Sequence, residues 1–147
     1  MRERSGHYSL AVQVGLGLSF AVAAGLAIYG AVAHIESDTV RLAIQDLRAR
    51  AGELVDLIEA RQKERLTTPF LRAHLTQWDR AVGDLDKELA DAKQANAQQA
   101  EARAHAAQMR ALGAELRAAP GSANDAAHDA AARILDALIA QERALKQ

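Results

Sequence analysis

The fold of this chain is decided by residues 40–92, which read VRLAIQDLRARAGELVDLIEARQKERLTTPFLRAHLTQWDRAVGDLDKELADA. On each side of a short interruption, apolar residues recur at alternating intervals of four and three, the spacing of a coiled-coil helix. We call these two apolar stripes the first and second seams. The first seam comprises Val40, Ile44, Leu47, Ala51, Leu54 and Ile58, and the second comprises Leu71, Leu75, Trp78, Val82, Leu85, Leu89 and Ala92.

The interruption between the seams is Leu66-Thr67-Thr68-Pro69. Proline disfavours helix at the residue before it and suits the first turn of a new helix, so we expect a turn at 67–69 with Thr68 as the N-cap. Two heptad helices joined by a short turn fold back on each other, and each covers the other's seam. The sequence therefore predicts an antiparallel helical hairpin.

Beyond the hairpin the apolar pattern weakens. Residues 94–100 offer a narrow alanine face, and Met109, Leu112 and Leu116 resume the stripe one residue out of phase. A helix can absorb such a shift as a stutter. Because no glycine or proline marks a turn near Asn96, we expect one long helix over residues 70–118; a break near Asn96 would instead make two helices.

Pro120-Gly121-Ser122 ends this region and predicts a second turn at 120–123. Asn124 or Asp125 can cap a last helix. Its stripe consists of Ala127, Ala131, Ile134, Leu138, Gln141 and Leu145. The predicted fold is all-α, and residues 36–147 form a three- to four-helix, coiled-coil-like bundle with the hairpin at its centre.

The N-terminal part of the chain has the pattern of a membrane anchor. Residues 10–35 read LAVQVGLGLSFAVAAGLAIYGAVAHI and contain no fixed charge, and about 20 apolar residues suffice to cross a bilayer. We expect a single transmembrane helix that continues into the first seam helix. Arg2 and Arg4 precede it, and Glu36 and Asp38 follow it. This bias predicts that residues 1–9 are cytoplasmic and residues 36–147 periplasmic, on a bacterial inner membrane.

Two further readings concern the same segment. Ala31-Val32-Ala33 fits a signal-peptide cleavage site, but the apolar stretch is longer than the roughly 7–15 residues usual for a signal. Small residues let two membrane helices approach closely, so a small-residue stripe favours a helix–helix docking face. That stripe comprises Gln13, Gly17, Ala21 and Gly25. An even simpler explanation is that glycine and alanine are common in membrane helices.

Composition excludes several classes of function. Of the 147 residues, 35 are alanine and only five are aromatic, which argues against the wide core of an enzyme. Cysteine is absent, so thiolate chemistry and disulfides are excluded. The net charge of −1 does not suggest a nucleic-acid binder. Alanine seams bury little area, so we expect a second copy of the chain or another membrane-protein subunit as partner, together with membrane lipid.

No catalytic, phosphate-binding or metal-binding motif is present, and we expect no enzymatic activity and no cofactor. The five histidines show no pairing at helical spacing and are expected to be solvated. A cluster of carboxylates between residues 84 and 91 is interpreted as the solvent-exposed face of an amphipathic helix. Basic residues gather only at the hairpin tip, which predicts either an ordinary solvated helix end or a contact with acidic groups of a partner. They are Arg61, Lys63, Arg65 and Arg72.

The segment Lys87-Glu-Leu-Ala-Asp-Ala-Lys93, followed by Asn96, resembles the middle of phage inner-membrane spanins, which share this layout of a short cytoplasmic start, one span and a helical periplasmic part. The resemblance covers about ten residues. It implies an outer-membrane lipoprotein partner and membrane fusion during host lysis. Spanins of the best-known kind carry cysteines that this chain lacks, which leaves a covalent dimer in doubt.

Three roles follow for the chain as a whole. The first is a non-enzymatic, single-pass adaptor or accessory subunit of a cell-envelope complex that acts by helix–helix docking through its seams and its span. The second is the four-helix sensory module of a chemoreceptor or sensor kinase, present as a fragment. That role would add a small-molecule ligand, and a break near Asn96 would complete its helix count. The third is a spanin.

Overall fold

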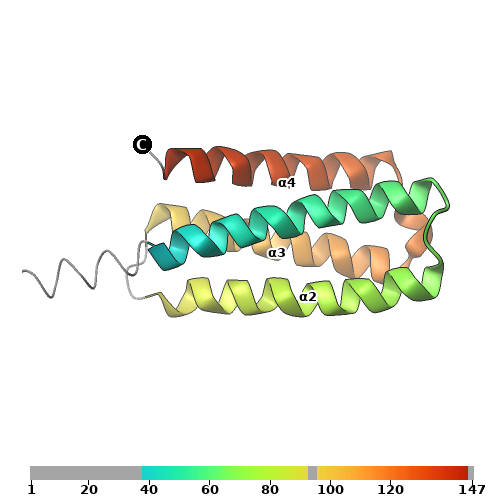
Figure 1. Ribbon diagram of the computed structural model, residues 1–147, viewed down its shortest axis with the longest axis horizontal. Coiled ribbons are helices and arrows are strands. Elements are labelled where there is room, and N and C mark those ends of the chain that lie inside the picture. Colours follow the sequence, from blue (N-terminus) through green and yellow to red (C-terminus); the bar gives the residue numbers. More distant parts are fainter. Residues whose placement is uncertain (1–37, 93–95, 146–147) are drawn as a thin grey trace, which may run out of the picture. The chain divides into compact units, whose positions relative to one another are not determined.

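A computed structural model describes residues 38–92 and 96–145, and these residues are helical apart from short turns (Figure 1). Successive helices run in opposite directions, which makes an up-down-up-down four-helix bundle in which residues 38 and 145 lie at the same end. The elements are a helix over 38–62, which we call the first helix, α2 (Thr68–Asp91), α3 (Ala97–Ala118), a 3-10 turn η1 (Pro120–Ser122) and α4 (Asp125–Ala144).

The expected membrane helix at 10–35, its docking face (Gln13, Gly17, Ala21 and Gly25) and its junction with the first helix lie outside the described residues. Within 38–92 and 96–145, none of the helices combines the length and the apolar character needed to cross a bilayer.

The first turn occupies residues 63–67, slightly before the predicted 67–69, and it has a different capping residue. The first helix ends in a Schellman motif, in which the amide of Glu64 donates to the carbonyl of Arg61 and that of Arg65 to Ala60. Glu64 occupies the left-handed region at φ 54°. Thr67, rather than the predicted Thr68, caps α2, because its hydroxyl oxygen accepts a hydrogen bond from the backbone amide of Phe70 at 3.4 Å.

The expectation of one long helix over 70–118 was wrong. α2 ends at Asp91, and Asn96 caps a new helix through a reciprocal capping box with Gln99. The Gln99 side chain is buried and also donates to the backbone carbonyls of Leu89 and Ala92, in the last turn of α2. One glutamine side chain therefore hydrogen-bonds backbone groups at the end of α2 and at the start of α3. This break has neither a glycine nor a proline.

The two seams of the hairpin form most of the bundle core. All six first-seam residues are buried, and so are Leu71, Leu75, Trp78, Val82 and Leu89 of the second seam. The other helices add Ala102, Ala106, Met109, Leu116, Ala127, Ala131, Ile134 and Leu138. Leu85 and Ala92 are corrections to the second seam, since both are only half-buried at the edge of the core. Leu85 also lines a surface groove.

Trp78 joins three helices at the middle of the bundle. Its indole nitrogen donates to the backbone carbonyl of Arg50 in the first helix at 3.0 Å. Its ring occupies space that a side chain on Gly113 of α3 would fill, because a Cβ there would lie 2.7 Å from the ring. Gly113 is therefore a close-approach position, and the sequence analysis did not identify it.

Candidate functional site

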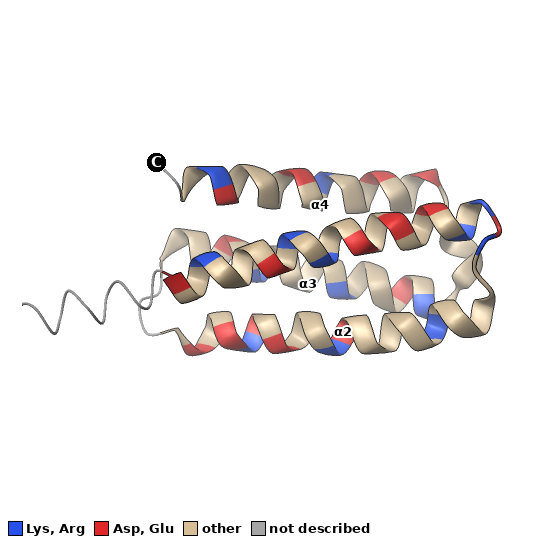
Figure 2. Cartoon of the chain, in the orientation of Figure 1, with Lys and Arg blue, Asp and Glu red and all other residues tan. Residues whose placement is uncertain are grey.

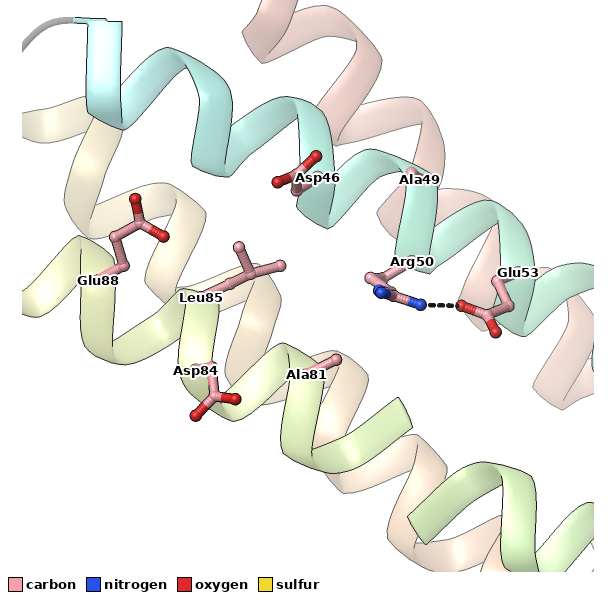
Figure 3. A pocket seen from close by; sticks show the side chains of 8 residues that line it. All are labelled: Asp46, Ala49, Arg50, Glu53, Ala81, Asp84, Leu85 and Glu88. Atoms are coloured by element: carbon pink, nitrogen blue, oxygen red, sulfur yellow. Dashed lines mark hydrogen bonds and ion pairs between the residues drawn. The ribbon is translucent and has the colours of Figure 1, made fainter. Parts of the chain in front are cut away.

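Two grooves on the described surface of the bundle lie between neighbouring helices, and a third lies at the tip, between the first turn and the turn at Pro120. The first, which we call the carboxylate groove, has a volume of about 380 Å³ and runs between the first helix and α2 (Figure 3). Leu85 and two alanines form its apolar part, and charged side chains of both helices surround them. Its lining residues are Asp46, Ala49, Arg50, Glu53, Ala81, Asp84, Leu85 and Glu88.

The single cation of the carboxylate groove is already paired. Arg50 donates to Glu53 at 2.8 Å, and His74 of α2 lies 2.6 Å from the other oxygen of the same carboxylate. Partial burial raises the pKa of Glu53, but the hydrogen bonds from Arg50 and His74 outweigh it and hold that pKa below its usual value. Among the described residues, no hydrogen bond or ion pair reaches the other three carboxylates, Asp46, Asp84 and Glu88. The groove is thus acidic and suited to a cationic group.

The second groove, which we call the α3/α4 groove, has a volume of about 370 Å³ and is mostly apolar. His105 is half-buried, and neither of its ring nitrogens is solvated or hydrogen-bonded, which corrects the expectation that the histidines are solvated. The small side chains of the alanine-rich helices leave this space open. The lining residues are His105, Gln108, Ala111, Leu112, Ala130, Arg133 and Ile134.

The predicted basic tip is not a single cluster. Arg61 donates to the carbonyl of Leu66 at 2.8 Å, Lys63 pairs with Glu59 at 2.7 Å, and Arg72 donates to the carbonyl of Arg117 at 3.2 Å. Three of the four side chains are therefore engaged with different local partners, and Arg65 is exposed. Figure 2 shows acidic residues mixed with basic ones along the helices.

Polar contacts that the sequence analysis missed hold α4 against the first helix. Glu142 is buried and accepts from Arg48 at 2.7 Å and from Gln45 at 3.2 Å. At the other end of the pair, Gln62 donates to Asp125 at 3.3 Å and His128 lies 3.6 Å from Glu59. A signal for Glu142 was available, because it stands four residues after Leu138, on the buried side of the last helix.

The burial of the seams bears on how the chain can act. The apolar stripes expected to recruit a partner are occupied inside the bundle, where the four helices cover one another. Within 38–92 and 96–145, no group of three or more histidine, cysteine or acidic side chains is arranged to hold a metal ion. The surface features left for recognition are the two grooves and the tip.

Comparison with known proteins finds no match among protein-family models, curated proteins or solved structures. The spanin resemblance and the functional roles therefore stay predictions.

Proposed function

We propose that this chain is a non-enzymatic, membrane-anchored sensory module. In this proposal residues 10–35 span a bacterial inner membrane and the four-helix bundle stands on its periplasmic side. The bundle receives a small molecule in a surface groove and responds by changing how α4 sits against the first helix.

One observation carries this choice among the three predicted roles. The capped break at Asn96 gives four helices, whose seams are all used inside the bundle, with residues 38 and 145 at one end. An adaptor that recruits partners through its seams would need those stripes exposed. In a bundle whose seams are buried, the outer grooves are free to bind a ligand. Residue 145 then lies at the same end of the bundle as residue 38.

The contacts between α4 and the first helix suit a small adjustable movement. They are hydrogen bonds and ion pairs near both ends of the helix pair, including Arg48–Glu142 and Glu59–His128. Part-exposed contacts such as Glu59–His128 are individually modest and exchange readily with water, whereas the carboxylate of the Arg48–Glu142 pair is buried, so that end is held more firmly. Since α4 also lines the α3/α4 groove, a ligand bound in that groove would contact α4 directly and change its position.

The absence of cysteine allows a direct test on the full chain in membrane vesicles. Two cysteine pairs report on the two ends of the α4 contact: Gln45→Cys with Glu142→Cys, and Gln62→Cys with Asp125→Cys. A third pair, Asp86→Cys with Arg103→Cys, bridges α2 and α3 and serves as the matched control. The vesicles are oxidised with and without a panel of small carboxylates, amino acids and amines.

A sensory module changes the ratio of disulfide formation at the two α4 pairs when its ligand binds, while the control pair stays constant. Constant ratios throughout the panel would contradict the proposal. Its location is tested by fusions after residue 147. Alkaline phosphatase, which needs disulfides and so an oxidising compartment, should be active there, and green fluorescent protein should be dark. The reverse result would place the bundle in the cytoplasm.

The adaptor role has one observation of its own. Phe70, next to the basic tip, is 53% exposed, and its ring stacks on His74 of the same helix. An exposed aromatic ring beside cationic side chains is typical of protein interfaces. If the tip docks on another envelope protein, Phe70→Ser should abolish a crosslink to that protein, whereas Leu42→Ser, at an equally exposed leucine, should not.

A further inference from the structure

The α3/α4 groove contains polar side chains that the described part of the chain does not use. The ring nitrogens of His105 are shielded from solvent and have no hydrogen-bond partner. A carboxylate oxygen of Glu101 lies 3.9 Å from Nε2 of His105, which exceeds hydrogen-bond length. Because both nitrogens are covered, an occupant of the groove would reach them only if the ring turned.

A cation stands on the rim of the same groove. Arg133 of α4 is exposed, and no carboxylate within 38–92 or 96–145 pairs with it. Arg48, Arg103 and Arg110 differ in this respect, because each holds a carboxylate on a neighbouring helix, whereas Arg65, Arg80 and Arg143 also have no carboxylate partner among the described residues but do not line this groove. A guanidinium binds a carboxylate through two parallel hydrogen bonds. The open end of the groove therefore favours an anion.

The remainder of the groove is apolar. Leu112 and Ile134 form its sides, and two alanines leave the space between them unfilled. A volume of about 370 Å³ lies at the small end of the range found for ligand pockets, roughly 300–1,000 Å³. The groove matches a molecule with one anionic group and a compact apolar body.

We propose that the α3/α4 groove binds a small monocarboxylate with an apolar body, whose carboxylate pairs with Arg133 and whose apolar part packs on Leu112 and Ile134. This inference rests on the proposed sensory function and gives it a ligand class. The carboxylate groove is a poor alternative for the same ligand, because its three unpaired carboxylates would repel an anion.

The test uses the full chain in nanodiscs of zwitterionic lipid, with empty nanodiscs as the blank for partition into lipid. The probe is 4-fluorobenzoate, whose binding is followed by fluorine NMR. We expect saturable binding with a dissociation constant on the order of 0.1–1 mM, since the groove is open and the ligand is small. The uncharged 4-fluorobenzyl alcohol and the cationic 4-fluorobenzylamine have the same ring and should each bind at least about tenfold more weakly.

Substitutions place the binding at this groove. Arg133→Gln should weaken 4-fluorobenzoate binding by about tenfold or more, because it removes the charged partner. Arg143→Gln, on the same helix and equally exposed but outside the groove, should leave binding unchanged. Ala130→Leu fills the groove with a good helix former and should abolish binding. Circular dichroism of each variant confirms that it is folded.

Three results would overturn the inference: no saturable binding up to about 10 mM, equal or tighter binding of the alcohol or the amine, or binding that survives both Arg133→Gln and Ala130→Leu. The sensory proposal can fail separately. If 4-fluorobenzoate binds as expected but leaves both α4 disulfide pairs unchanged, the ligand site stands and the sensory role does not. If another panel member changes the disulfide ratio while 4-fluorobenzoate fails to bind, the sensory role stands and this ligand class does not.

Discussion

The α2–α3 interface and the contacts of α4 are built from different kinds of side chain. Between α2 and α3, the Trp78 ring fits the space left by Gly113, and Met109 and Leu89 are fully buried. α4 presents two alanines, Ala127 and Ala131, to the core together with Ile134 and Leu138, and polar contacts near both ends also hold it against the first helix. Alanine buries much less apolar area than leucine or tryptophan.

This difference indicates which helix can move. An interface that interlocks a large ring with a glycine resists sliding, because any shift creates a clash or a cavity. Small side chains and part-exposed polar contacts impose a weaker penalty on the same shift. We therefore expect α2 and α3 to be the fixed part of the bundle, and under the proposed function α4 is the helix whose position a ligand changes.

The largest expected effect comes from removing the centre of the fixed part. Trp78→Ala should lower the free energy of unfolding by about 3–5 kcal/mol, because it leaves a cavity and removes the hydrogen bond to Arg50. Urea unfolding followed by circular dichroism measures the loss. A loss below about 1 kcal/mol would mean that the ring is not packed among the three helices.

The fit between Trp78 and Gly113 gives the second prediction. Gly113→Ala should destabilise the bundle by about 2 kcal/mol, since its Cβ would overpack the ring. The same substitution in a Trp78→Leu background removes the clash and should be neutral or stabilising by up to about 1 kcal/mol, the helix preference for alanine. Equal effects in both backgrounds would refute the interlocking arrangement.

The contacts of α4 should give a smaller and more local effect. Glu142→Ala leaves Arg48 and Gln45 without their acceptor and should cost about 1–2 kcal/mol. Amide hydrogen exchange should accelerate along α4 while α2 and α3 keep their protection. Acceleration spread evenly over the four helices would show that α4 is as firmly held as the rest.

The smallest effect concerns acid. The pKa of Glu53 in the folded chain lies below its usual 4.5, so the carboxylate contributes stability above about pH 4.5 that is lost as the pH falls through the lowered pKa. This part-exposed contact is worth below about 1 kcal/mol. The melting temperature should therefore drop by roughly 2–4 °C on acidification from this group. Glu53→Gln should remove this part of the acid-induced drop in melting temperature, whereas Asp56→Asn, at an exposed neighbouring carboxylate, should not.

Much of the helical structure could be predicted from the sequence, because it depends on the spacing of apolar residues along the chain. The 4-3-4-3 intervals of the two seams identified buried positions, with Leu85 and Ala92 as the exceptions, since a residue at a seam position can still lie beside a groove or at a helix end. The helix break at Asn96 was not predicted, although the sequence contains a pattern that indicates it. Asn96 and Gln99 have the spacing of a capping box, but the absence of glycine and proline favoured one continuous helix in the prediction.

The candidate grooves could not be predicted in the same way. Each is lined by residues of two helices, and their alignment depends on how far the helices are shifted along each other. The histidines illustrate the problem. The sequence expected solvated side chains, yet His74 pairs with Glu53 and His105 is shielded, because neighbours from other helices cover them.

By itself, the sequence determined that most of residues 38–92 and 96–145 form helices with apolar stripes and that the chain turns near Thr67 and Pro120, because helix periodicity and proline geometry act over a few residues. Only the tertiary structure decided that four helices close on one another, that Gly113 admits Trp78 and that Glu142 holds the first helix. Those outcomes depend on contacts between residues up to about 100 positions apart, and local spacing does not specify such contacts.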